Sequence, residues 1–141
     1  MAASETKDQF DIDGYNEIHQ LIESAMKGSA DGDVAQLRGA FHEEARMFGE
    51  VFGRRYDEPI ASFFEMCEDH PLGKGNRYRS RIVSITPVGP AAMVMVAEDG
   101  CWGSASFVDF FTVTQINGTW KITNKTFAYT GGDIPREVLG G

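Results

Sequence analysis

The stretch FVDFFTVTQINGTWKITNKTF, residues 107–127, contains two apolar runs on either side of an Asn-Gly pair. Asn-Gly is one of the strongest signals for a two-residue hairpin loop, because both loop positions need a positive φ. A loop at Asn117-Gly118 predicts two antiparallel strands, and counting outward from it places Asp109 opposite Thr126. An ionisable carboxyl is therefore expected in the middle of a predominantly apolar hairpin.

Side chains alternate between the two faces of a strand, so this register divides the hairpin into two surfaces. The face that we expect to lie against the interior is the more apolar in its middle and comprises Phe107, Asp109, Phe111, Val113, Trp120, Ile122, Asn124, Thr126 and Ala128. The face expected to point outward comprises Val108, Phe110, Thr112, Thr114, Thr119, Lys121, Thr123, Lys125, Phe127 and Tyr129. A three-residue loop with a bulge would shift this register by one.

An inward carboxylate at Asp109 has two interpretations. Burial among Phe and Trp side chains disfavours its charge unless donors compensate, and the predicted register places Asn124 and Thr126 nearest to it. In the first interpretation Asp109 is a structural residue held by those two groups. In the second it is the acid or base of a pocket, tuned by its surroundings.

The rest of the chain places helices before strands, which predicts an α+β fold with an antiparallel meander at its end. Apolar residues recur at helical spacing from Tyr15, with Asp13 as the expected N-cap, and again after Asp33. The length of 141 residues predicts a single domain over 13–130, with a flexible lead-in at 1–12 and a tail at 131–141. The expected elements are helices over about 15–28, 34–41 and 59–70, short strands at 45–49 and 51–55, and extended runs at 78–87, 92–98, 102–116 and 119–129.

Composition argues against several classes of function. A formal net charge of −8 disfavours nucleic-acid binding, which depends on Lys and Arg neutralising phosphates. Arg77, Arg79 and Arg81 share one face of a predicted strand, which we interpret as a solvated face, with phosphate binding as the alternative. No apolar run approaches the roughly 20 residues that span a bilayer, and the first residues lack a leader pattern. We therefore expect no membrane association and a cytoplasmic location.

Metal and cofactor chemistry is also disfavoured. The two cysteines and three histidines have no metal-ligand spacing. No glycine-rich loop opens a helix after a strand, as a nucleotide site would require. We therefore expect no metal and no cofactor.

The order of a helix bearing Tyr15 and Ile18, a Gly32-Asp33 linker, Leu37 followed by Phe41-His42, and above all the stretch from Asp109 to Phe127 is distinctive. It resembles the nuclear transport factor 2-like superfamily, and within it the lumazine-binding, SnoaL-like branch. The resemblance implies a cystatin-like cone, in which a strongly curved antiparallel sheet wraps around N-terminal helices and leaves a cavity. Members often dimerise through the outer sheet face, and the mixed Thr and aromatic surface predicted here favours such a homodimer.

The same superfamily hosts binding proteins, isomerases, dehydratases and association domains, so the fold leaves the function open. We expect a protein that binds a small apolar or aromatic organic ligand, with Asp109 as the polar anchor. One alternative is a cofactor-independent lyase or isomerase, similar to SnoaL-like dehydratases or ketosteroid isomerases, in which Asp109 moves a proton and His42 assists. A second alternative is a non-catalytic association domain. The residues expected to contact the ligand are Phe41, Met47, Phe63, Phe64, Trp102, Phe107, Phe111, Trp120, Asn124 and Thr126.

Overall fold

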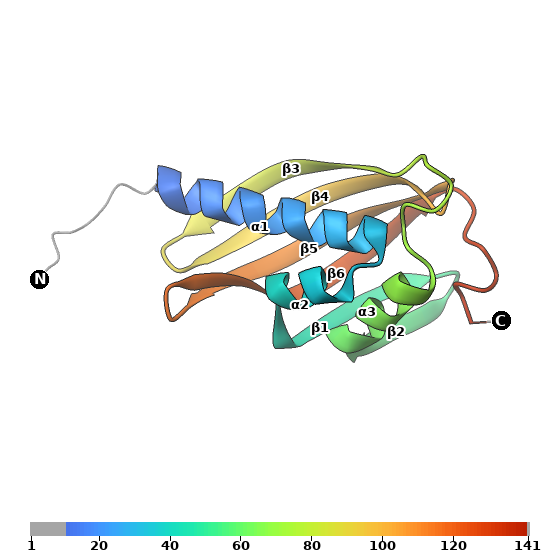
Figure 1. Ribbon diagram of the computed structural model, residues 1–141, viewed down its shortest axis with the longest axis horizontal. Coiled ribbons are helices and arrows are strands. Elements are labelled where there is room, and N and C mark those ends of the chain that lie inside the picture. The colour runs from blue at the N-terminus through green and yellow to red at the C-terminus, as the bar shows by residue number, and fades with distance from the viewer. Residues whose placement is uncertain (1–10, 141) are drawn as a thin grey trace, which may run out of the picture.

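The computed structural model describes residues 11–140, over which a six-stranded curved sheet carries three helices on one side (Figure 1). The predicted α+β class, with N-terminal helices held against a curved sheet, is confirmed. Most of the expected lead-in, residues 1–10, lies outside the described residues. In chain order the elements are α1 (Ile12–Asp31), α2 (Val34–Ala40), β1 (Phe41–Val51), β2 (Arg54–Pro59), α3 (Ile60–Asp69), β3 (Arg79–Val88), β4 (Ala91–Cys101), β5 (Ala105–Ile116) and β6 (Thr119–Gly131).

The strands lie in the order β2-β1-β6-β5-β4-β3. The meander from β3 to β6 is antiparallel as predicted, and β1 and β2 form a second antiparallel hairpin. The expectation of a wholly antiparallel sheet is wrong at one place, because β1 runs parallel to β6. This pairing covers the edge that the last strand of the meander would otherwise leave open.

Helix boundaries follow local capping chemistry. The N-cap of α1 is Asp11, whose carboxylate accepts a hydrogen bond from the backbone N–H of Gly14 at 3.2 Å, so the prediction of Asp13 was wrong. The helix ends at Gly32, which has a left-handed φ of 70°. Asp33 caps α2 as predicted. The short helix α2 then leads directly into β1, which starts at Phe41 rather than near residue 45.

The final hairpin contains a β-bulge that decides the site. The two-residue loop is present, since Ile116 pairs with Thr119. Between this loop and Asp109, however, one extra residue, Thr123, is inserted on β6, so Asp109 pairs with Phe127 rather than with Thr126. The Thr123 hydroxyl donates to the backbone carbonyl of Thr112 across the irregularity at 3.1 Å.

The bulge exchanges the two faces of β6 beyond Thr123. Near the loop, Trp120 and Ile122 are buried as predicted. Farther along, Lys125 is buried, whereas Thr126 and Ala128 are exposed, the reverse of the predicted arrangement. The register of the first half of the hairpin is thus confirmed and that of the second half is wrong by one residue.

The described residues after β6 fold back against the open end of the sheet. Ile134 packs against the core. The guanidinium of Arg54 donates to the backbone carbonyl of Leu139 at 2.9 Å. This segment, residues 132–140, was expected to be a flexible tail, and in the structure it forms part of a cavity wall.

Candidate functional site

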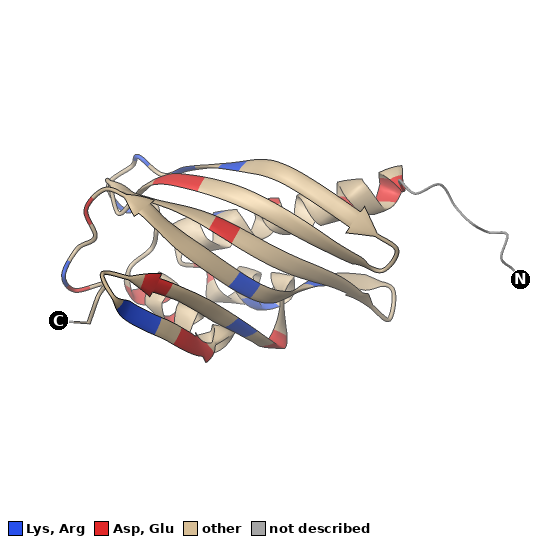
Figure 2. Cartoon of the chain, turned by 180° about the vertical axis from the view of Figure 1, so that it is seen from behind, with Lys and Arg blue, Asp and Glu red and all other residues tan. Residues whose placement is uncertain are grey.

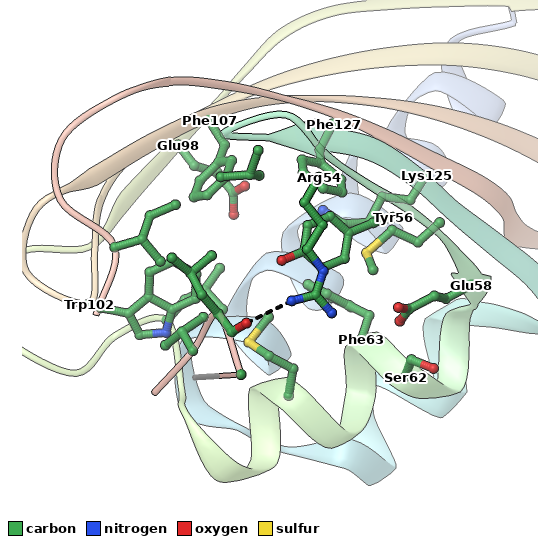
Figure 3. Close-up of a pocket in the computed structure, with 18 residues that line it drawn as sticks. Arg54, Tyr56, Glu58, Ser62, Phe63, Glu98, Trp102, Phe107, Lys125 and Phe127 are labelled. Carbon is green, nitrogen blue, oxygen red and sulfur yellow. Dashed lines mark hydrogen bonds between the residues drawn. The ribbon is translucent and has the colours of Figure 1, made fainter. Parts of the chain in front are cut away.

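A cavity of about 260 Å³ lies between α3, the β1–β2 hairpin and the inner face of β4 to β6 (Figure 3). Its walls are mainly apolar and aromatic, and the C-terminal segment completes them through Ile134, Val138 and Leu139. The polar side chains that reach it include Arg54, Tyr56, Glu58, Ser62, Glu98 and Lys125. An apolar hollow with a few converging polar groups is typical of small-molecule sites.

A buried charged cluster, consisting of Tyr78, Glu98, Asp109 and Lys125, lies on the sheet side of this cavity. The ammonium of Lys125 donates to Asp109 Oδ1 at 3.0 Å, and the Tyr78 hydroxyl donates to Glu98 Oε2 at 2.8 Å. Asp109 is 1% exposed, Glu98 4% and Lys125 5%. Glu98 and Lys125 face the cavity, whereas Asp109 lies behind them.

Strand alternation explains why Glu98 and Asp109 are neighbours. Asp109 pairs with Val96 across β4 and β5, and Glu98 follows Val96 two residues later on the same face. The two carboxyls therefore lie diagonally on the inner face of adjacent strands. Lys125 reaches the same place from β6 because of the bulge.

The protonation states follow from burial and from neighbouring charges. Burial, then the charge of Asp109 and the contact between the two carboxyls, raises the pKa of Glu98 well above its usual range, against the opposing effects of Lys125 and Tyr78. Burial alone would lower the pKa of Lys125, but the neighbouring carboxyls, chiefly Asp109, outweigh it and raise that pKa. The surroundings therefore favour the acid form of Glu98 and the ammonium form of Lys125.

Aromatic rings surround the ammonium of Lys125. Its Nζ lies 4.5 Å from the ring centroid of Phe63, 5.5 Å from that of Phe127 and 5.7 Å from that of Phe111. These distances are within the range of cation–π attraction. Together with Asp109, the rings hold the ammonium in one position at the end of the cavity.

Trp102 is fixed in the cavity wall by its backbone. It has a left-handed φ of 54°, which is unfavourable for a bulky residue. Two hydrogen bonds hold it there: its backbone N–H donates to Leu72 O, and its indole N–H donates to His70 O, each at 2.9 Å. The two bonds thereby fix the ring in the cavity wall.

A second hollow, between α1 and β3, shares Tyr78 with the charged cluster. Tyr78 lines this hollow, and its hydroxyl, which bonds Glu98, also lies 3.7 Å from the sulfur of Met26. Arg79 and Arg81, interpreted above as a solvated face, are exposed and line the same hollow. Arg79 is paired with Asp99 at 3.0 Å.

The structure brings together some of the predicted site residues. Asp109 points inward, but the predicted donors Asn124 and Thr126 are wrong: both lie on the outer side of β6 because of the bulge, and Lys125 takes their place. Met47, Phe63, Trp102 and Phe107 line the cavity. The remaining predicted contacts are buried in the core without lining it, namely Phe41, Phe64, Phe111 and Trp120.

His42 lies apart from the cluster. It is the second residue of β1, its Nδ1 accepts a hydrogen bond from the backbone N–H of Glu44 at 3.0 Å, and it is not among the cavity residues.

Several cavity residues were missed by the sequence analysis. Lys125 and Phe127 had been placed on the outer face, and the C-terminal residues had been treated as a tail. Glu98 could have been found, because β4 alternates inward Val94 and Val96 with outward residues and the next inward position is Glu98. Within residues 11–140 no group of three or more His, Cys, Asp or Glu could hold a metal ion. No helix of the described range is long and apolar enough to cross a membrane.

Comparison with known proteins places this geometry in a defined class. The fold is that of nuclear transport factor 2-like proteins. One solved structure, described as an NTF2-like protein of unknown function, comes from Methylobacillus flagellatus KT and has a TM-score of 0.79. Its sequence is 26% identical, and the match covers 87% of this chain and 97% of that one. Another, from Shewanella baltica OS155, has a TM-score of 0.78 and 24% identity over 88% of this chain and 99% of that one.

The family model described as "Putative lumazine-binding" matches residues 13–128, and the chain belongs to this family. Among curated proteins, the chain is similar to "Aldolase FrzH" from Cladobotryum sp, with 24% identity over 106 residues, covering 75% of this chain and 80% of the relative.

Proposed function

We propose that this protein binds a small, mainly apolar or aromatic organic molecule in the cavity beside the charged cluster. The observation that carries the proposal is the coexistence of an unfilled apolar hollow of about 260 Å³ with buried ionisable groups at its end. A purely structural association domain would gain stability by filling that hollow with side chains. Asp109 anchors the ligand indirectly, by holding Lys125 at the cavity surface.

A cavity-filling substitution tests this proposal. Ser62→Trp places a large ring in the cavity from α3, and Glu65→Trp, on the solvent side of the same helix, is the matched control. Saturation-transfer NMR with one- and two-ring aromatic compounds, lumazine included, should detect binding to the wild type and to Glu65→Trp but not to Ser62→Trp. Binding to none of the three proteins, or equal binding to all, would overturn the proposal.

A second candidate function is cofactor-independent acid–base catalysis of the lyase or isomerase kind. It is favoured by Glu98 in the cavity wall, whose raised pKa favours the protonated form, since a neutral carboxylic acid can donate a proton or a hydrogen bond to a reacting oxygen. The name of the aldolase relative points in the same direction. Incorporation of solvent deuterium next to the carbonyl of small cyclic ketones, lost in Glu98→Gln, would support it. The assisting role of His42 stays a prediction, which His42→Ala in the same assay would test.

We also propose a homodimer formed through the outer face of the sheet. Met93 on β4 is 60% exposed and Phe110 on β5 is 40% exposed, and Figure 2 shows that face with few charged positions along its central strands. Sedimentation of the wild type should give a dimer and Phe110→Lys should give a monomer; a monomeric wild type contradicts the proposal. The cytoplasmic location likewise stays a proposal, for cell fractionation to test.

A further inference from the structure

The ammonium of Lys125 has donors to spare. It carries three N–H bonds, and among the described residues one hydrogen bond is formed, to Asp109 Oδ1. Aromatic rings attract the charge but do not replace strong acceptors, and an unused donor on a buried cation is unfavourable. Lys125 also forms part of the cavity surface. Lys125 can therefore donate hydrogen bonds to an acceptor inside the cavity.

Glu98 presents a second donor beside it. Tyr78 already donates to Glu98 Oε2, which leaves the proton of the acid as the group that Glu98 can offer. Asp109 Oδ2 is buried and has no hydrogen-bond partner within residues 11–140, so it is one acceptor toward which that proton can turn. A ligand oxygen in the cavity is the other.

Charge balance selects the type of oxygen. Lys125 is matched by Asp109, and the raised pKa of Glu98 favours its neutral form, so the cluster is already balanced. Arg54 and Glu58 also line the cavity, from β2, and their charges are of opposite sign. A carboxylate ligand placed against the cluster would add an uncompensated buried charge there, and an ammonium ligand would meet the like charge of Lys125, because the free Asp109 Oδ2 lies behind the cavity surface. A neutral carbonyl oxygen accepts hydrogen bonds without disturbing this balance.

The cavity also limits the body of the ligand. The rings of Phe63, Phe107 and Phe127 line it next to the cluster (Figure 3). A dry cavity of about 150 Å³ accommodates a benzene ring, so a hollow of about 260 Å³ suits one or two fused rings.

We infer that the ligand or substrate of this cavity is a one- or two-ring compound with a neutral carbonyl group, whose oxygen accepts hydrogen bonds from Lys125 Nζ and the Glu98 carboxyl. This inference rests on the proposed binding function. It adds the recognised group, and it assigns Lys125 and Glu98 as the residues that recognise it.

A matched series of compounds on one carbon frame tests the inference: 1-indanone, indane, 1-aminoindane and indane-1-carboxylate. Calorimetric titration of the wild type should give 1-indanone at least about tenfold tighter binding than indane, because two of its hydrogen bonds come from a charged and an acidic donor. The amine and the carboxylate should both bind more weakly than the ketone. Equal affinity for ketone and hydrocarbon, or tighter binding of either ion, overturns the inference.

Variants assign the effect to the cluster. In Asp109→Leu/Lys125→Met, where both charges are removed at similar volume, the preference for 1-indanone over indane should disappear while indane still binds. Lys121→Met, near the loop end of β6 and outside the cavity, is the control and should keep the preference. A preference that survives in the double variant overturns the role of Lys125. The wild-type ranking decides the ligand class even if the variant does not fold, and failure of all four compounds to bind refutes the proposed function instead.

Discussion

Removing one member of the Asp109–Lys125 pair should destabilise the protein far more than removing both. Lys125→Met leaves the Asp109 carboxylate buried beside Glu98 without its counter-ion, and Asp109→Leu leaves a buried ammonium among rings. Breaking a buried ion pair in this way costs about 3–5 kcal/mol of unfolding free energy. Because natural domains have only about 5–15 kcal/mol in total, each single variant should lose a large part of its stability.

The double variant Asp109→Leu/Lys125→Met should behave differently. It removes both desolvated charges and fills the space with apolar groups, a change that is often neutral or stabilising. We therefore expect an unfolding free energy within about 1 kcal/mol of the wild type or above it, and a coupling energy between the two sites of about 3 kcal/mol or more. At this chain length the single variants should unfold at temperatures lower by roughly 10 °C or more.

Urea denaturation followed by far-UV circular dichroism measures all four proteins of the cycle. The exposed pair Lys27–Asp31, at 2.7 Å on α1, gives a control cycle in which the coupling should be small. A double variant as unstable as the singles would show that the pair itself stabilises the fold. Single variants no worse than those of the control pair would show that the cluster is more hydrated than its burial indicates.

Three further predictions concern the neighbouring groups. Glu98 retains in the folded state a proton that the unfolded chain releases, so the free energy of unfolding should fall as pH rises from the ordinary pKa near 4.5 toward the raised folded value, by up to about 1.4 kcal/mol per pH unit. Glu98→Gln should lack this slope in denaturation curves measured between pH 5 and 8. A slope that persists in the variant would assign the effect to other groups. Burial raises the pKa of Cys67 and of Cys101, so both thiols should resist a disulfide reagent until urea unfolds the chain, and rapid labelling of the native protein would contradict their burial. Removal of residues 133–141 should leave the far-UV circular dichroism spectrum unchanged but speed the dissociation of a bound test compound, since this segment closes the cavity. Arg54→Ala should show the same effect more weakly. Unchanged dissociation in both variants would show that the segment has no part in binding.

Much of the fold was accessible from sequence because local signals agreed with one another. The Asn-Gly loop, the period-two alternation of β5 and the Asp33 cap each act over a few residues, and all three were predicted correctly. The inward direction of Asp109 was predicted from the apolar residues that share its face of β5. That prediction held because the bulge lies on β6 and leaves the alternation of β5 intact between Asp109 and the loop.

The charged cluster was not accessible in the same way. Its assembly depends on one inserted residue on β6, stabilised by hydrogen bonds between Thr123 and Thr112 that a pattern of apolar residues does not reveal. A one-residue error in register moved Lys125 from the interior to the surface. The closing of the cavity by residues 132–140 depends on a contact to Arg54 across 85 positions of sequence, which no local signal specifies.

Strand alternation gives the cluster a neighbour on the opposite side of the sheet. Phe110 follows Asp109 and Thr126 follows Lys125, and both are exposed on the outer face. A single peptide unit separates Phe110 from Asp109 and Thr126 from Lys125, the pair at the proposed binding site. A fluorinated side chain at position 110, or a spin label at position 126, would thus monitor occupancy from behind, without entering the hollow or altering its chemistry.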